Sequence, residues 1–416
     1  MVCDIEIRNG RLVTPDAVYS GGRLTITDGR IHRIDPDAGS RARRARDRID
    51  AEGRIVMPGI VDLHGDDIEQ HLYPRPEARI DTETALRSSD RTNLTSGITT
   101  KFHAIAFEDT PEQDRSIATA TEIAESIAAA DDLLVDNRIH ARCELGESSV
   151  AAVESVLGRL EVDLVSIMHH SPGEGQFADE VVFRKRYGET DPNSPEKKDG
   201  FHGNRQNVEG MDEFLRRRES VDERTLHRRA EWIVGRALDA GAVVASHDDE
   251  RPESVEWVAD LGVEICEYPV TRRAAERAKE LGVTTAMGAP NLVRGGSLWG
   301  NLGAETLIEH DALDVLCSDY HPPSLLAAPF VTSGEPLYER VRRVTAAPAD
   351  AVGLEDRGRL RVGARADVVV VDPEPVPTVD CVIVDGVRRF HSGSGTGSAE
   401  SAVTGDLLSS NDTFAS

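Results

Sequence analysis

Met57–Pro76, MPGIVDLHGDDIEQHLYPRP, is the stretch of the sequence that decides the fold. Its apolar residues at 59–61 lead directly into Asp62, His64 and Asp66, an order that predicts a buried strand ending in polar side chains. Because side chains alternate between the two faces of a strand, His64 and Asp66 are expected to point to the same side, where one cation can contact both. The alternative is a polar loop after a core strand, in which His64 only forms hydrogen bonds.

The same pattern, a short apolar run followed by polar residues, recurs along the central part of the chain. The runs lie at 59–66, 97–104, 139–145, 163–171, 242–250, 262–269, 283–291 and 314–321. Helix-like stretches separate them, so we predict eight parallel strands that alternate with helices and close into a (β/α)8 barrel.

Strand-rich segments flank this central region on both sides. Residues 1–57 contain the dipeptides Asn9-Gly10 and Asp28-Gly29, and residues 351–390 contain Asp385-Gly386. Such dipeptides are typical of two-residue turns in β-hairpins. We therefore predict that the two segments pair into one small β-sandwich domain formed by both termini.

Three further parts complete the predicted organisation. The barrel is expected to span residues 58–350. One interval between its strands is long, and we interpret residues 172–235 as an insertion that lies like a lid over the barrel mouth. Residues 391–416 are rich in Ser, Gly and Thr without periodicity, which predicts a disordered tail.

The charge of the chain restricts its partners. The net charge is −26, from 74 acidic and 48 basic residues, and only five of the basic residues are lysines. This composition, with 4% aromatic residues, suggests adaptation to a high-salt cytoplasm; an acidic protein from a low-salt cell is the alternative. In either case the negative field repels nucleic acid and phosphorylated ligands. An anionic substrate must therefore be held locally, by metal ions or clustered arginines.

Other features of the composition favour a cytoplasmic protein. The five cysteines are scattered and odd in number, which is typical of a reducing compartment. Residues 1–10 lack the layout of a signal peptide. No apolar run approaches the roughly 20 residues that span a bilayer, so no membrane partner is expected.

Ionisable side chains gather at the carboxyl ends of the predicted strands, where the chemistry of a barrel lies. These side chains are His64, Asp66, His103, Glu144, His169, His170, His247, Asp248, Glu267, Asp319 and His321, together with the amide of Asn291. Imidazole and carboxylate groups in combination favour zinc, manganese, iron or nickel over calcium. The sequence therefore predicts a divalent metal centre at the barrel mouth.

Six motifs resemble those of one family. They are HGDDIEQHLYPRP (64–76), RCEL (142–145), SIMHHSPGEGQF (166–177), ASHDDE (245–250), GAPNLVRGGS (288–297) and CSDYHP (317–322). Together with the layout, they are similar to the amidohydrolase superfamily, and within it to the diphosphatase branch of carbon–phosphorus lyase phosphonate metabolism. The resemblance covers about residues 3–390. It implies a TIM-like metal-dependent hydrolase barrel of the (β/α)8 type with a small β-sandwich domain.

The resemblance also implies roles for particular residues. The metal ligands would be His64, Asp66, Glu144, His170 and His247. Asp319 would be the catalytic aspartate, which takes a proton from water and passes it to the leaving group. The cofactors would be divalent ions, with zinc as first choice and manganese, iron or nickel as alternatives.

The sequence departs from the superfamily pattern at several positions. Asp66 stands where most members have histidine, and His169 stands where this branch is expected to have aspartate. The two ligand histidines fall on strands four and five instead of five and six. Lys101 is interpreted as a lysine at the surface or the barrel mouth, not as the carboxylated lysine of other members. The roles of His71 and His321 stay open.

Loops at the mouth offer groups that can hold a phosphorylated substrate. The candidates are Arg75, Arg79, Asn291, Arg294, Gly295 and Gly296. Gly295 and Gly296 can expose backbone N–H groups to a phosphate, while Arg294 adds a bidentate guanidinium. Arg75 lies between two prolines, which restrict its backbone.

The implied function is the release of pyrophosphate from alpha-D-ribose 1-methylphosphonate 5-triphosphate. One alternative on the same fold is hydrolysis of a C–N bond in a cyclic amide, an amidine or an N-acetyl sugar phosphate. A second alternative is a scaffold without catalytic activity, which the complete set of ligand residues disfavours. The expected partner is a small anionic substrate, and a homo-oligomer is left open.

Overall fold

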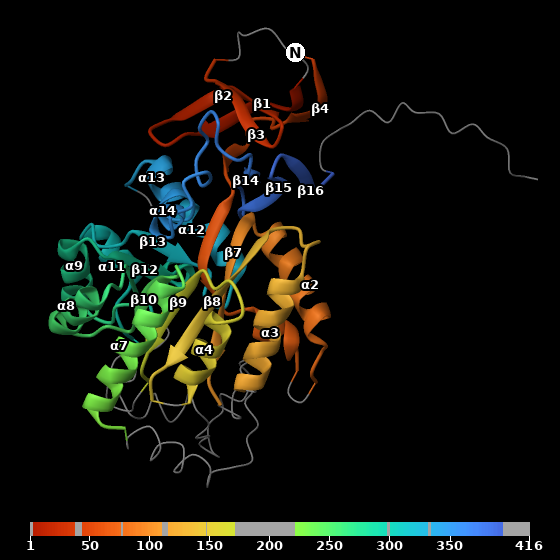
Figure 1. Ribbon diagram of the computed structural model, residues 1–416. Coiled ribbons are helices and arrows are strands. Elements are labelled where there is room, and N and C mark those ends of the chain that lie inside the picture. Colours follow the sequence, from red (N-terminus) through yellow and green to blue (C-terminus); the bar gives the residue numbers. More distant parts are fainter. Residues whose placement is uncertain are drawn as a thin grey trace, which may run out of the picture.

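The computed structural model describes residues 3–37, 44–75, 78–109, 115–146, 148–170, 221–297, 300–331 and 334–393. These residues form a parallel β-barrel surrounded by helices, with a second sheet at one end (Figure 1). The predicted insertion at 172–235 lies outside the described residues as far as residue 220, and the predicted tail lies outside them from residue 394. Within the described ranges, no helix combines the length and the apolar character needed to cross a membrane.

Eight parallel strands form the barrel, each paired with the next one along the chain. They are β6 (Ile60–Gly65), β7 (Ile98–Phe107), β8 (Asp136–Glu144), β9 (Leu164–Met168), β10 (Val243–His247), β11 (Ile265–Glu267), β12 (Thr284–Gly288) and β13 (Val315–Cys317). A parallel bridge between Gly65 and Asp319 joins the last strand to the first and closes the barrel. The eight strands coincide with the eight predicted runs, so the predicted barrel is confirmed.

Helices follow the strands and pack on the outside of the barrel (Figure 1). Those described are α1 (Ile68–Leu72), α2 (Thr82–Thr95), α3 (Ile117–Ala129), α4 (Ser149–Leu157), α7 (Glu223–Asp239), α8 (Pro252–Leu261), α9 (Arg272–Leu281), α10 (Ala289–Arg294), α11 (Ala304–Glu309), α12 (Pro322–Val331), α13 (Leu337–Arg342) and α14 (Ala346–Ala351). The side chains of Asp81, Ser116, Asp222 and Thr271 cap α2, α3, α7 and α9 by accepting a backbone N–H of the first turn.

Apolar side chains fill the middle of the barrel. The buried cluster there consists of Val61, Leu63, Phe102, Leu164, Ala245, Ile265, Ala286, Val315 and Cys317, and it is closed by Ala347 and Ala349 of α14. His247 and Glu267 come two residues after Ala245 and Ile265, so they point into the barrel on the carboxyl side of this cluster. The apolar cluster thus fills the barrel below the polar residues of the mouth.

The second sheet contains strands from both ends of the chain, as predicted. Its strands are β1 (Cys3–Val13), β2 (Val18–Thr27), β3 (Arg30–Asp35), β4 (Ala45–Asp50), β5 (Ile55–Pro58), β14 (Val368–Asp372), β15 (Thr378–Val384) and β16 (Val387–His391). The order is β16-β15-β14-β5-β1-β2-β3, and β4 pairs with β1. Antiparallel pairing of β5 with β14 joins the two terminal segments.

Two of the three predicted hairpin turns are confirmed. Asp28-Gly29 joins β2 to β3 and Asp385-Gly386 joins β15 to β16, and all four residues have positive φ, as a type I′ turn requires. The turn predicted at Asn9-Gly10 is wrong. There β1 continues as one strand, and Asn9 with φ 59° lies at a shift in its register with β2, which is a β-bulge instead of a chain reversal.

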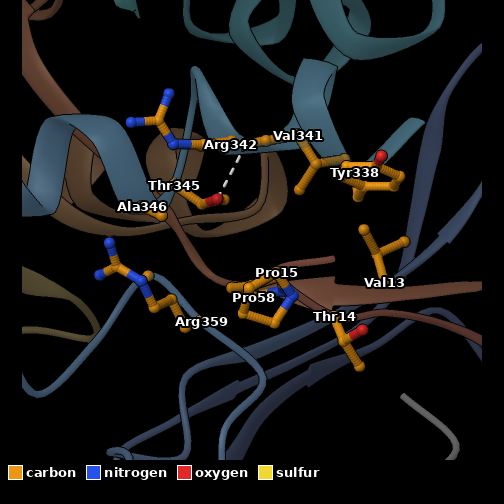
Figure 2. Close-up of a pocket in the computed structure, with 11 residues that line it drawn as sticks. Val13, Thr14, Pro15, Pro58, Tyr338, Val341, Arg342, Thr345, Ala346 and Arg359 are labelled. Atoms are coloured by element: carbon orange, nitrogen blue, oxygen red, sulfur yellow. Dashed lines mark hydrogen bonds between the residues drawn. The ribbon is translucent and has the colours of Figure 1, made fainter. Parts of the chain in front are cut away.

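A cavity of about 230 Å³ lies where the second sheet meets the barrel (Figure 2). Val13, Pro15, Pro58, Tyr338 and Thr345 are among its lining residues. Pro58 lies two residues before the start of the first barrel strand, so the cavity lies at the amino ends of the strands. It is therefore separate from the carboxyl ends, where the ionisable side chains gather.

Candidate metal centre

A β-bulge in the first barrel strand directs His64 into the barrel. Asp62 pairs with Lys101 and Gly65 pairs with His103, so β6 has two residues between these pairs where β7 has one. Such an extra residue re-aims the side chains around it. Leu63 joins the apolar interior, and the next residue, His64, also lies inside, against Glu267 and other polar groups of the mouth.

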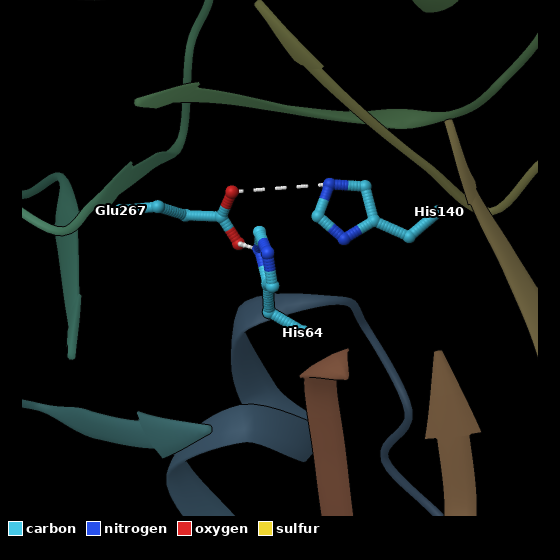
Figure 3. A group of neighbouring side chains, drawn as sticks. All are labelled: His64, His140 and Glu267. Carbon is cyan, nitrogen blue, oxygen red and sulfur yellow. Dashed lines mark hydrogen bonds and ion pairs between the residues drawn. The ribbon is translucent and has the colours of Figure 1, made fainter. Parts of the chain in front are cut away.

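Glu267 orients the imidazole of His64 (Figure 3). The His64 Nδ1 lies 3.0 Å from the Glu267 Oε1, and both side chains are buried. Burial, Arg142 and His247 together hold the pKa of His64 well below its ordinary value, so the imidazole is neutral. A neutral imidazole beside a carboxylate donates from Nδ1, which leaves the lone pair on Nε2 available for a metal ion.

His140 lies beside this pair but has no free nitrogen. Its Nδ1 lies 2.9 Å from the carbonyl oxygen of Leu63, an acceptor, so Nδ1 carries the hydrogen. Its Nε2, also 2.9 Å away from the hydroxyl of Ser166, then accepts from that group. Burial lowers the pKa of His140 to about 3. His140 is therefore a neutral structural residue beneath His64.

A second group of donors is assembled from strands β8, β9 and β10. The His170 Nδ1 lies 2.9 Å from Glu144, and its Nε2 lies 3.3 Å from the Asp248 Oδ2. The same Asp248 oxygen lies 3.0 Å from the Nδ1 of His247. His170, His247 and Asp248 offer ligand atoms within 4.8 Å of one another. The ring centre of His247 lies 5.6 Å from that of His64 and 5.7 Å from that of His170. The two groups therefore form one cluster.

Asp66 and Asp319 lie where the barrel closes. The backbone N–H of Asp319 donates to the carbonyl of His64, and that of Asp66 donates to the carbonyl of Asp319. Gly288 leaves room for the Asp319 carboxylate, because a Cβ at Gly288 would be 3.0 Å from its Oδ2. These two backbone hydrogen bonds hold both aspartates beside His64. The five sequence-based ligand candidates and Asp319 thus all occur at the carboxyl end of the barrel.

The donor set fits a divalent transition-metal ion. Neutral imidazoles and carboxylates are the ligands that such ions prefer. The His247 Nδ1 is buried and lacks a hydrogen-bond partner within the described residues, although the Asp248 oxygen is 3.0 Å away. The His247 Nδ1 and the Asp248 Oδ2 belong to a group of three residues whose ligand atoms lie within 4.8 Å of one another, as the ligands of one ion would. His169 contacts Glu144 at 3.2 Å, which places it beside a candidate ligand.

Three strand ends at the mouth have backbones in the left-handed region. Asp248, Tyr268 and Asp319 have φ values of 63°, 53° and 55°. This conformation is uncommon for residues other than glycine, above all for a bulky one such as Tyr268, and clusters at functional sites. The ring of Tyr268 lies about 5 Å from the rings of both His64 and His247. Its buried hydroxyl has no hydrogen-bond partner in the described part of the chain.

The candidate substrate residues are more dispersed. Arg79 donates to Glu122 at 2.8 Å, so its guanidinium is held against α3. The Asn291 side chain bonds to the backbone of Leu302 and Ala304, which ties the start of α11 to α10. Arg75 and Arg294 are exposed.

Gly295 and Gly296 both have positive φ at the end of α10, so their backbone conformation suits the proposed exposure of N–H groups. The His321 Nδ1 lies 2.8 Å from the Ser324 hydroxyl at the start of α12. The His71 Nε2 lies 3.9 Å from Asp67. The involvement of all these residues in substrate binding stays a prediction.

Lys101 is buried and not at the surface, so that part of its sequence-based interpretation is wrong. It is a fully buried residue of β7, and its Nζ lies 2.7 Å from Asp62, 2.6 Å from Asp67 and 3.0 Å from the Ser318 hydroxyl. A Cβ on Gly65 would be 1.7 Å from this Nζ, which explains the glycine after His64. The only signal in the sequence was a lone lysine within an apolar strand.

The contact of Glu267 with His64 predicts a graded response to substitution. We expect Glu267→Ala to weaken metal binding about 10- to 100-fold, as loss of such supporting carboxylates does in other metal sites. Glu267→Gln should be milder, because the amide oxygen still accepts from Nδ1. The measurement is bound metal against a competing chelator. Equal affinity in wild type and Glu267→Ala would show that this carboxylate does not orient His64.

The chain is similar to known hydrolases in its sequence. A family model described as the amidohydrolase family matches residues 329–390. The alpha-D-ribose 1-methylphosphonate 5-triphosphate diphosphatase of Escherichia coli (strain K12) is 33% identical over 377 residues, which are 88% of this chain and 94% of the relative.

Solved structures show the same fold. The 5-methylcytosine deaminase from Klebsiella pneumoniae, liganded with phosphonocytosine, has a TM-score of 0.59 at 16% identity, covering 93% of this chain and 98% of that one. A D-hydantoinase has a TM-score of 0.56 at 15% identity, covering 93% of this chain and 95% of its own. At such identities the likeness is one of fold.

Proposed function

Because the chain belongs to the amidohydrolase superfamily, in the branch of the alpha-D-ribose 1-methylphosphonate 5-triphosphate diphosphatases, we propose that it releases pyrophosphate from that triphosphate by hydrolysis. The observation that carries the proposal is the likeness to the diphosphatase over 94% of that enzyme's length. The buried donor cluster at the barrel mouth supports a hydrolytic activity, since a scaffold has no need for it. Phosphonate breakdown would be the setting.

The metal centre would be formed by His64, Asp66, Glu144, His170 and His247. Divalent ions bound there would lower the pKa of a water molecule and polarise the phosphoryl oxygen. Zinc is our first choice, because the donor set contains three imidazoles and two carboxylates. Asp248 contacts both His170 and His247, so it would either orient these rings or join them as a ligand.

Asp319 would serve as the proton carrier. Its backbone is tied to His64 and Asp66, and its carboxylate lies over Gly288 at the mouth. From there it would accept the proton of the attacking water and deliver it to the departing pyrophosphate. Because the leaving group is highly charged, cationic groups must offset that charge as it departs.

We also propose a cytoplasmic enzyme that is adapted to high salt. Its five cysteines are all free and buried, which suits a reducing compartment. The net charge of −26 with five lysines supports the adaptation to salt.

The test is a direct assay of the metal-loaded protein. We expect pyrophosphate and alpha-D-ribose 1-methylphosphonate 5-phosphate from the triphosphate, with little turnover of a panel of cyclic amides such as hydantoin and dihydroorotate. The His247→Ala variant, purified in parallel, is the control for contaminating phosphatases. Turnover of a cyclic amide without release of pyrophosphate would replace the proposed function by C–N hydrolysis.

A further inference from the structure

Arg142 is a buried cation in the barrel mouth with an unsatisfied hydrogen-bond donor among the described residues. Arg142 lies on β8, between His140 and Glu144 on the inward face of the strand. It is 6% exposed, and its buried Nε has no hydrogen-bond partner within the described residues. The nearest carboxylate oxygen, on Asp66, is 3.7 Å from its Nη1, which is too long for a hydrogen bond.

This lack of partners is unusual for a buried arginine. A guanidinium has five N–H donors, and buried charged groups normally satisfy them. Arg115, which is also buried at the mouth, shows the normal case, since it donates to Glu69 and Glu108 at 2.8 Å. Its donors are committed to the protein, whereas those of Arg142 are available for an acceptor that enters the mouth.

Arg142 lies next to the candidate metal ligands, so an acceptor that it binds would lie at the metal centre. Its charge acts on His64 and on Glu267, whose pKa values both respond to it, and Asp66 lies beside it. Three of the candidate ligands, His64, Asp66 and Glu144, are thus its neighbours in space or along the strand. A phosphate is an acceptor that matches the planar fork of a guanidinium.

We propose that Arg142 binds a phosphoryl group of the substrate at the metal centre. This proposal rests on the proposed function, because the triphosphate substrate of that function provides the anionic group that Arg142 would bind. Arg142 differs in this respect from the sequence-based candidates, since Arg79 is paired with Glu122 while Arg75 and Arg294 are exposed. The buried position also strengthens each bond, because little water competes for the donors.

The carboxylates of the mouth set a condition for this binding. Asp66, Glu144 and Glu267 would repel an anion in the metal-free protein. Bound divalent ions offset these charges, so Arg142 should act on anions only in the metal-loaded form. Pyrophosphate, the product of the proposed reaction, is therefore the appropriate probe for metal-loaded protein.

The experiment compares pyrophosphate binding to metal-loaded wild type, Arg142→Ala and Arg142→Lys by calorimetry at fixed ionic strength. We expect Kd to rise about 10- to 100-fold in Arg142→Ala, the usual effect of losing charge-assisted hydrogen bonds. Arg142→Lys keeps the charge but not the fork, so its Kd should lie between the two. Added methylguanidinium should partly restore binding to Arg142→Ala. Arg159→Ala, which removes an exposed arginine paired with Glu125, is the matched control and should not change Kd.

The outcomes separate this proposal from the proposed function. Unchanged pyrophosphate affinity in Arg142→Ala with full metal content would overturn the role of Arg142. A loss of metal in Arg142→Ala and Arg142→Lys would also overturn it, because Arg142 would then act through Asp66. If wild type releases no pyrophosphate from the triphosphate but binds pyrophosphate through Arg142, the proposed function fails while the anion site stands.

Discussion

Replacing Asp319 with asparagine is expected to lower kcat by at least about 100-fold while the protein keeps its metal, because a positioned acid–base group contributes on the order of 10²–10⁴-fold. Asparagine retains the size of the side chain and an oxygen donor, but it cannot take a proton. The backbone of Asp319 has φ 55°, a conformation that asparagine also adopts readily, so the variant adds no strain. Steady-state kinetics and metal analysis of the same preparation check the prediction.

The dependence of the rate on pH gives a second readout. Loss of a general base should change the pH dependence of kcat/KM, which a change in folding alone would not do. Asp248→Asn is a useful comparison, because Asp248 has a similar backbone but contacts His170 and His247, so we expect it to affect metal content first. If Asp319→Asn loses its metal, Asp319 is mainly a ligand. If it keeps both metal and rate, the chemistry lies elsewhere.

Replacing Lys101 with methionine is expected to destabilise the barrel by about 3–5 kcal/mol, because it leaves buried carboxylates without their cation. Lys101 neutralises both Asp62 and Asp67, and all three side chains are buried. The Asp62 Oδ1 also accepts the backbone N–H groups of His64 and Ser318. The variant should therefore unfold at lower urea concentration and also bind metal less well.

Lys279→Met is the matched control for this prediction. Lys279 is paired with Asp311, but 42% of its side chain is exposed, and such surface pairs contribute about 0–1 kcal/mol. A second comparison replaces Lys101, Asp62 and Asp67 together by neutral residues, which should recover part of the lost stability, since no charge is then left unpaired. Equal unfolding midpoints for wild type and Lys101→Met would show that the two aspartates tolerate burial without it.

The positions of the barrel strands could be predicted from the sequence because their signal is local. A strand covered on both faces is a short, largely apolar run, and its first ionisable residue marks the mouth, as His247 does at the end of β10. The turns at Asp28-Gly29 and Asp385-Gly386 are equally local, since these residues tolerate positive φ. From such signals alone, the sequence predicted the barrel, the terminal sheet and the residues at the strand ends.

The partners of those residues depended on the tertiary structure. Asn9-Gly10 has the composition of a turn, yet pairing with β2 makes it a bulge. Simple alternation cannot predict the direction of His64, because the extra residue in β6 appears only when β7 pairs with it.

Glu267 meets His64 across 203 residues of sequence, and Lys101 meets Ser318 across 217. That the Arg142 Nε lacks a hydrogen-bond partner among the described residues likewise depends on the surrounding strands. Local periodicity therefore determined where the polar residues of the mouth lie. Only the closed barrel, which brings distant strands within hydrogen-bond distance, decided which of them are ligand candidates, which support them and which cation is left for a substrate.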